Sequence, residues 1–207
     1  MTTKRMWTGM AMAGLLCWSA GSTHAQIIGL QLADTAEMRP EGDASLALGS
    51  TIGEDLRFFG GRGTFGVMDG IRVFLDFGVV DMDDDGPDLA GQVGGIISLP
   101  LDFISDLGVR AALYGVNGDT RDIVGGDLMF LSSGETLLDG LFIYGGIGAD
   151  VRNMDAQNAT HHSSDHTEVN PAFTAGAIYN ITANIAVYAE ASHVDSPFFG
   201  FGVRLRP

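Results

Sequence analysis

Three closely spaced aspartates form the first group of residues that could bind a ligand. Asp81, Asp83 and Asp85 precede Gly86 in the pattern D-x-D-x-D-G, where carboxylates one residue apart converge before a sharp bend, as calcium loops require. The calcium pattern stops there, because Gln92 stands where a bidentate glutamate is needed. We therefore expect a solvated acidic loop and no cofactor, with Ca²⁺ binding as the alternative.

A histidine-rich stretch offers a second group. His161, His162 and His166 lie within six residues of one another, with Asp165 between them, and imidazoles with a carboxylate suit zinc or copper. No second stretch of sequence is evident that would anchor such a site, and a loop loses conformational entropy when it closes around an ion. We expect an exposed polar loop, with a transition-metal site as the alternative.

Charged residues also alternate with apolar ones along extended segments. From Ile71 to Val80 every odd-numbered residue is apolar, which predicts a strand with one apolar face and one partly polar face. The preceding Met68-Asp69-Gly70 predicts a hairpin loop with a left-handed Gly70. Counting back across this loop places Arg62 opposite Asp76.

The same alternation recurs along the chain and predicts about ten strands. Most are nine to twelve residues long, which is the length a tilted strand needs to cross a bilayer and exceeds the usual strand of a soluble sandwich. The fold class is therefore all-β, a closed antiparallel up-and-down transmembrane β-barrel. Eight strands are the alternative, because the Gly53–Glu54 junction could merge or loosen the first two. The expected strands are 43–52, 55–67, 71–80, 89–98, 108–116, 123–132, 140–151, 171–180, 184–193 and 197–206.

The two faces of these strands differ in a way that favours a membrane barrel. A soluble barrel would bury its apolar face, but here the opposite face is rich in glycine and too sparse in charge for a good solvent surface. We expect the apolar rows to face lipid and the polar face to line the lumen. The residues of this lumen polar network are Arg62, Arg72, Asp76, Arg110, Asp127, Asp150, Glu190 and Arg204. Paired with one another they would plug the barrel, which we favour, whereas unpaired and hydrated they would line a narrow conduit.

Glycines are expected to make room for a bulky inward ring. A three-residue loop at 181–183 would pair Gly176 with Tyr188, and a turn at 194–196 would pair Gly202 with the same tyrosine.

The first 25 residues predict a cleaved signal peptide. Lys4 and Arg5 precede an apolar run that ends in small residues at Ala25. Of the 11 basic residues these two lie in this segment, so the remainder carries nine arginines against 26 acidic residues, a formal charge of −17. Such acidity argues against nucleic-acid partners. Residues 26–42 have no convincing period and are expected to form a periplasmic tail before the barrel at 43–207.

Taken together, the chain resembles the small outer-membrane β-barrel superfamily, which includes the OmpA-like barrels. The resemblance rests on the signal peptide, the ten-residue amphipathic strands and a final strand that alternates Phe199, Phe201, Val203 and Leu205. It implies export to the outer membrane, contact with membrane lipid and insertion by the outer-membrane assembly machinery, but names no single function.

We expect a structural or surface-presenting outer-membrane protein with a largely plugged lumen and acidic external loops. A small passive porin-like channel is the alternative, and a soluble exported barrel that binds an apolar ligand is a second. Motifs such as G-x-S-x-G, H-E-x-x-H or a glycine-rich phosphate loop do not occur in the sequence. We therefore expect no enzyme activity.

Overall fold

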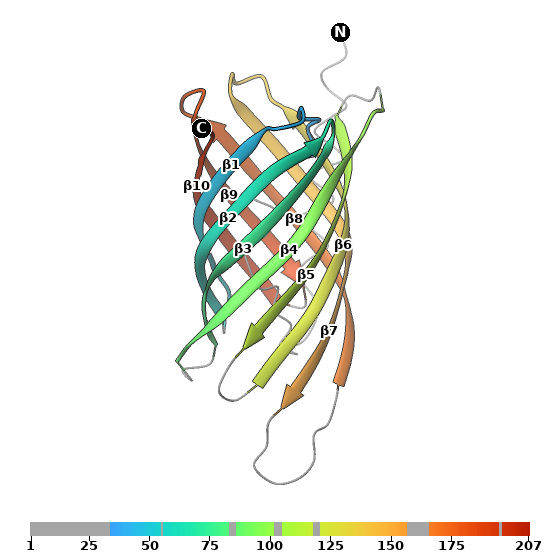
Figure 1. Ribbon diagram of the computed structural model, residues 1–207, viewed down its shortest axis with the longest axis vertical. Coiled ribbons are helices and arrows are strands. Elements are labelled where there is room, and N and C mark those ends of the chain that lie inside the picture. The colour runs from blue at the N-terminus through green and yellow to red at the C-terminus, as the bar shows by residue number, and fades with distance from the viewer. Residues whose placement is uncertain are drawn as a thin grey trace.

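Ten antiparallel strands, each hydrogen-bonded to its neighbours in sequence, form the fold, and pairing of the first strand with the last closes it into a barrel (Figure 1). The computed structural model describes residues 34–54, 56–82, 86–101, 105–117, 121–156, 166–194 and 196–207. In these residues no helix is long and apolar enough to cross a membrane. The strands are β1 (Ala44–Ile52), β2 (Leu56–Met68), β3 (Ile71–Met82), β4 (Pro87–Leu99), β5 (Asp106–Asn117), β6 (Arg121–Glu135), β7 (Leu141–Ala156), β8 (His166–Asn180), β9 (Ile185–Val194) and β10 (Ser196–Leu205). The predicted closed antiparallel barrel with ten strands is confirmed.

The hairpin of β2 and β3 has the register counted from the sequence. Arg62 lies opposite Asp76, Phe65 opposite Val73, and the turn glycine Gly70 has a φ of 74°. A positive φ is strained for residues with a Cβ, so glycine is the natural residue at this point. The tight turn thus sets which charges face each other across the two strands.

The apolar rows of the strands face outward. Leu75, Phe77 and Leu113 are 61%, 65% and 67% exposed, whereas their neighbours along each strand are buried inside. Successive side chains of a strand point to opposite faces of the sheet, so the outward direction of one side chain fixes the direction of all the others on that strand. The expectation that the leucine, valine, isoleucine and phenylalanine rows point away from the barrel axis agrees with this arrangement.

The connections define two ends. At one end, here called the turn end, β2, β4, β6 and β8 end and β3, β5, β7 and β9 begin, and β10 ends there as well (Figure 1). At the opposite end, here called the loop end, β1, β3, β5, β7 and β9 end and β2, β4, β6, β8 and β10 begin.

The register of β8 and β9 differs from the expected one. Tyr188 lies opposite Ile178 instead of Gly176, because the last paired residues of this hairpin are Asn180 and Ala186, with five residues between them instead of the expected three. The Thr182 hydroxyl accepts hydrogen bonds from the backbone of Asn184 and Ile185, which stabilises the longer turn. The pairing moves by two residues, so every side chain keeps its face.

Strands β7 and β8 are each about five residues longer at the loop end than the alternation predicts. The extension pairs Arg152 with Glu168, and the Arg152 guanidinium donates two hydrogen bonds to the Glu168 carboxylate. Charged and amide residues interrupt the apolar alternation there, which is why the sequence pattern ended early.

Candidate functional site: a filled polar lumen

The middle of the lumen contains a network that begins with an arginine–aspartate pair. Arg62 Nε and Nη2 donate to the two carboxylate oxygens of Asp76 over 2.6 and 2.7 Å, and Nη2 also reaches Gln92 Oε1 at 3.3 Å. Gln92 Nε2 in turn lies 3.5 Å from Asp127 Oδ2, and Arg110 pairs with the other oxygen of Asp127. Five neighbouring strands, β2 to β6, each supply one of these side chains.

Both arginines of this network contact the same aromatic ring. The Arg62 and Arg110 guanidinium carbons lie 4.3 and 5.1 Å from the centroid of the Phe74 ring. Cations are attracted to the face of an aromatic ring, so Phe74 stabilises both charges. The network therefore combines paired charge with a packed aromatic side chain.

Two tyrosines hold the remaining carboxylates of the predicted network. The Tyr114 hydroxyl donates to Asp150 Oδ2 and the Tyr144 hydroxyl donates to Glu190 Oε2, each over 2.7 Å. Each ring lies against a glycine of an adjacent strand: a Cβ at Gly125 would come within 2.4 Å of the Tyr114 ring, and one at Gly176 within 2.5 Å of Tyr144. Gly176 thus receives the ring of Tyr144, whereas Gly202 receives that of Tyr188, as expected.

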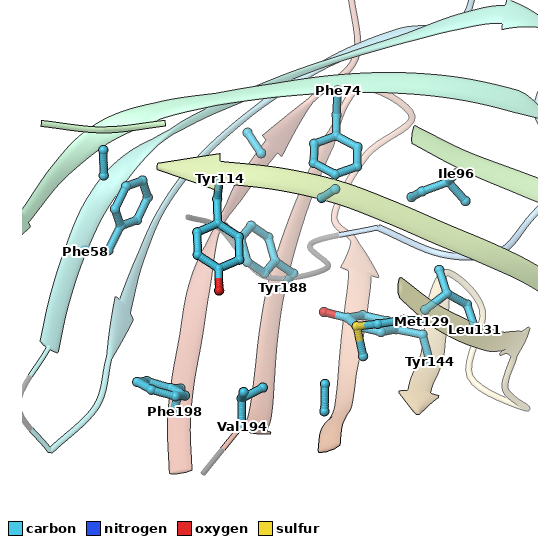
Figure 2. Close-up of a cluster of buried hydrophobic side chains, with 14 of the residues drawn as sticks. Phe58, Phe74, Ile96, Tyr114, Met129, Leu131, Tyr144, Tyr188, Val194 and Phe198 are labelled. Atoms are coloured by element: carbon cyan, nitrogen blue, oxygen red, sulfur yellow. The ribbon is translucent and has the colours of Figure 1, made fainter. Parts of the chain in front are cut away.

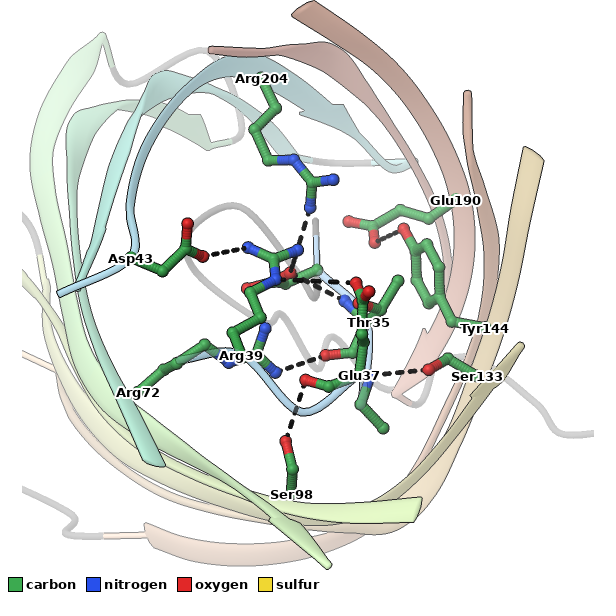
Figure 3. Close-up of polar contacts among 12 residues, drawn as sticks. Thr35, Glu37, Arg39, Asp43, Arg72, Ser98, Ser133, Tyr144, Glu190 and Arg204 are labelled. Atoms are coloured by element: carbon green, nitrogen blue, oxygen red, sulfur yellow. Dashed lines mark hydrogen bonds and ion pairs between the residues drawn. The ribbon is translucent and has the colours of Figure 1, made fainter. Parts of the chain in front are cut away.

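The turn end of the lumen is filled by main chain. Residues Asp34–Asp43 are here called the inserted segment; Asp34, Thr35, Ala36 and Arg39 are buried, and Figure 3 shows Thr35, Glu37 and Arg39 inside the ring of strands. The Asp34 carboxylate is 3% exposed and accepts from three guanidiniums. The distances are 2.8 Å to Arg39, 3.2 Å to Arg72 and 3.1 Å to Arg204. The sequence predicts a periplasmic tail at residues 26–42, and the residues of it that the structure describes begin at Asp34, inside the ring of strands.

Barrel-wall groups bind the backbone of the inserted segment. Arg72 Nη2 donates to the carbonyl of Thr35 at 2.6 Å, and Ser133 Oγ accepts from the amide of Ala36 at 2.9 Å. Ser98 Oγ donates to the carbonyl of Glu37 at 3.1 Å. Buried backbone groups without partners are costly, so these wall side chains allow an irregular segment to lie inside the barrel.

Large apolar side chains fill part of the loop end of the lumen, which the expected polar lining did not include. Buried side chains meet there from several strands, among them Phe58, Val194 and Phe198 (Figure 2). The Phe58 ring lies against Gly60 and Gly78, and Phe198 lies against Gly53; a Cβ at these glycines would approach the rings to about 2.5 Å. The loop end of the lumen therefore combines large apolar side chains with buried polar residues such as Thr51 and Ser192.

The lumen residues predicted from sequence all lie inside the barrel, but in three separate groups. Arg62, Asp76, Arg110 and Asp127 belong to the central network. Arg72 and Arg204 bind the inserted segment, and Asp150 and Glu190 pair with tyrosines. Sequence reasoning missed Asp34, Tyr114 and Tyr144; the tyrosines have the same inward parity as the predicted charges and could have been found from it.

The predicted metal ligands fall mostly outside the described residues. Asp81 is exposed at the loop end of β3, and Asp83 and Asp85 lie outside the description. His161 and His162 also lie outside it, and His166 is the first residue of β8. Within the residues that are described, no three histidine, cysteine or acidic side chains cluster as metal ligands would. The signal peptide at 1–25 likewise lies outside the description, so it stays a prediction.

The inserted segment has a strongly perturbed carboxyl group. Burial acts to raise the pKa of Asp34, but the charges of Arg39, Arg72 and Arg204 outweigh it, and the pKa lies well below its ordinary value of 3.8. The Asp34 carboxyl group is consequently ionised at neutral pH.

Comparison with known proteins finds likenesses among solved barrels. The sequence matches no protein-family model and no curated protein. The N-terminal β-barrel domain of Pseudomonas aeruginosa OprF is 13% identical with a TM-score of 0.42, over 82% of this chain and 100% of that domain. The outer membrane protein Omp33 of Acinetobacter baumannii is 12% identical (TM-score 0.40; 81% and 99%), and the KdgM porin is 9% identical (TM-score 0.42; 78% and 98%). At such identities and scores, none of these barrels indicates the function of this chain.

Proposed function

We infer that this chain is an integral outer-membrane β-barrel with a closed lumen, which presents its loop end at the cell surface. The observation that carries the inference is the outward apolar face, formed by rows of large side chains around a closed sheet. Soluble monomers rarely expose contiguous apolar surface of this extent, whereas lipid requires it. The closed ladder satisfies the backbone hydrogen bonds, which is the condition for strands to lie in hydrocarbon.

Closure of the lumen supports a structural or surface-presenting role. Rings and aliphatic side chains fill the loop end, the arginine network fills the middle and the inserted segment fills the turn end. In a barrel of this size wall side chains already occupy much of the interior. The proposal includes lipid and the outer-membrane assembly machinery as partners, no cofactor and no catalytic activity.

A passive channel is the second candidate, and the polar contacts of the inserted segment favour it. If this segment leaves the lumen, the turn end is lined by serine and arginine side chains such as Ser98, Ser133, Arg72 and Arg204. Polar walls of this kind admit water and ions.

Detergent-phase partitioning and heat-modifiable gel mobility test the membrane assignment. We expect the folded chain in the detergent phase, with unheated and heated samples migrating differently. Recovery of folded protein in aqueous buffer without detergent would support the soluble ligand-binding barrel instead. Single-channel recording in a planar bilayer then separates the two membrane readings: the closed lumen predicts no steady openings, and a passive channel predicts ion-selective ones.

A further inference from the structure

The Asp34 carboxylate occupies a site built by arginines of the barrel wall. Arg72 reaches it from β3 and Arg204 from β10, two strands separated by β1 and β2 around the barrel. Two guanidiniums that converge on one carboxylate are the donor set that proteins use for carboxylate and phosphate groups. The inserted segment contributes the third guanidinium, Arg39, to its own aspartate.

The site keeps donors that Asp34 does not use. The Nε atoms of Arg72 and Arg204 are buried and have no hydrogen-bond partner, although both side chains are almost completely enclosed. Buried polar atoms are normally paired, so unpaired donors indicate a site that can accept more oxygen atoms than one aspartate supplies.

The other buried carboxylates of the described lumen do not compete for this site. Asp76 and Asp127 pair with Arg62 and Arg110, and Asp150 and Glu190 accept from tyrosines. When the inserted segment leaves the lumen, Asp34 and Glu37 leave with it, and the two wall arginines then face the lumen without these carboxylates.

Polar contacts, more than apolar burial, hold the inserted segment. Its deepest described residues are Asp34, Thr35 and Ala36, and Ala36 is the largest apolar side chain among them. Met38 is about half exposed. Competing anions and water can replace hydrogen bonds and ion pairs, whereas a large buried apolar side chain would anchor the segment.

We propose that Arg72 and Arg204 form an oxyanion-binding site at the turn end of the lumen. Asp34 of the inserted segment occupies this site. Carboxylate or phosphate anions compete with Asp34 for it and thereby displace the inserted segment. The inference rests on the proposed closed lumen. It assigns to this barrel a binding activity for small oxyanions and a mouth that becomes anion-selective when the segment is displaced.

Labelling of a buried cysteine in the inserted segment tests the proposal. In the Thr35→Cys chain, with Cys17→Ser so that no other thiol is present, we expect slow reaction with a membrane-impermeant maleimide, because Thr35 is buried. Inorganic phosphate or citrate should accelerate labelling more than chloride of the same ionic strength. Asp34→Asn in this background should accelerate it about tenfold or more without added oxyanion, the loss expected for a charge-assisted contact.

Three further variants control for folding and position. Asp34→Glu keeps the carboxylate and should label nearly as slowly as the Thr35→Cys parent. Asp139→Asn changes the same charge at an exposed turn residue of the same end and should have no effect. The pair Arg72→Gln and Arg204→Gln should abolish the response to phosphate and citrate. Heat-modifiable mobility shows that each variant is folded.

Each outcome decides between the proposals. Protection under all conditions, also in Asp34→Asn, would overturn the oxyanion site and leave the closed lumen intact. Rapid labelling of the parent without added oxyanion would overturn both. Equal acceleration by chloride would show that ionic strength alone loosens the segment and would refute oxyanion recognition. If Asp34→Asn gives channel openings, their reversal potential in a KCl gradient must be anion-selective, and cation selectivity would contradict the proposal.

Discussion

Removal of the Asp76 carboxylate tests whether the central network stabilises the barrel. Asp76 receives two hydrogen bonds of 2.6 and 2.7 Å from Arg62, and both side chains are almost fully buried. Breaking a buried ion pair by deleting one partner typically costs about 3–5 kcal/mol, because the other charge stays buried without compensation. Arg62 retains Gln92 Oε1 at 3.3 Å and the Phe74 ring at 4.3 Å. We therefore expect Asp76→Ala to lower the free energy of unfolding by about 3 kcal/mol, the lower part of that range.

Urea unfolding of the chain refolded into lipid vesicles measures this loss. With a slope of about 1–3 kcal/mol per molar urea, the midpoint should fall by about 1–3 M. The double variant Arg62→Met and Asp76→Leu removes both charges and should recover most of the loss. Asp139→Ala, at an exposed turn residue, should stay within about 0.5 kcal/mol of the parent. A loss below about 1 kcal/mol for Asp76→Ala, or a double variant no more stable than the single one, would refute the reasoning.

Three further predictions concern pH, packing and lipid contact. Because the folded pKa of Asp34 lies below its ordinary 3.8, its contribution to stability is complete above that value and is lost as the pH falls towards the folded pKa. The difference in urea midpoint between the parent and Asp34→Asn should accordingly be constant from pH 8 to about 5 and shrink below about pH 4; a constant difference down to pH 2 would contradict it. Gly125→Ala should destabilise the barrel by about 1–3 kcal/mol, because the new Cβ meets the Tyr114 ring, whereas Gly115→Ala has no atom closer than 3.5 Å and should cost less; equal urea midpoints would argue against the ring packing. Leu113→Arg, at an outward residue near the middle of β5, should cost about 2–4 kcal/mol in vesicles, and Leu137→Arg, in the exposed turn, close to nothing; tolerance of both would contradict lipid contact.

Local sequence patterns were sufficient to predict which face of each strand points outward and the register of the β2–β3 hairpin. The alternation from Ile71 to Val80 sets the parity of β3, and Gly70 sets the length of the turn that places Arg62 opposite Asp76. Both depend on residues close in sequence, where side-chain period and turn geometry leave few choices. The predicted β8–β9 register was wrong for a local reason as well, since the Thr182 hydroxyl stabilises a turn with two more residues between the last paired positions than the predicted one.

The inserted segment could not be predicted in the same way. It forms no helix or strand, so no periodicity marks it, and its key contact joins Asp34 to Arg204, 170 residues along the chain. The alternation of inward and outward residues along β3 and β10 places Arg72 and Arg204 in the lumen, but it does not predict which carboxylate they pair with. The large apolar side chains at the loop end were missed for a related reason, because inward parity alone does not say that Phe58 and Phe198 occupy that part of the lumen.

The small wall residues of the turn end and the inserted segment complement each other. Ser98 and Ser133 are buried inside the barrel at the turn end, and such short side chains leave more of the lumen free than arginines or aromatic rings do. Main chain occupies that space, and both serine hydroxyls bind it, one as donor to Glu37 and one as acceptor from Ala36. Small wall side chains without hydrogen-bonding groups would leave the turn end open, and large wall side chains would exclude the inserted segment. Short hydroxyl side chains therefore leave room for the main chain at the turn end and also bind it.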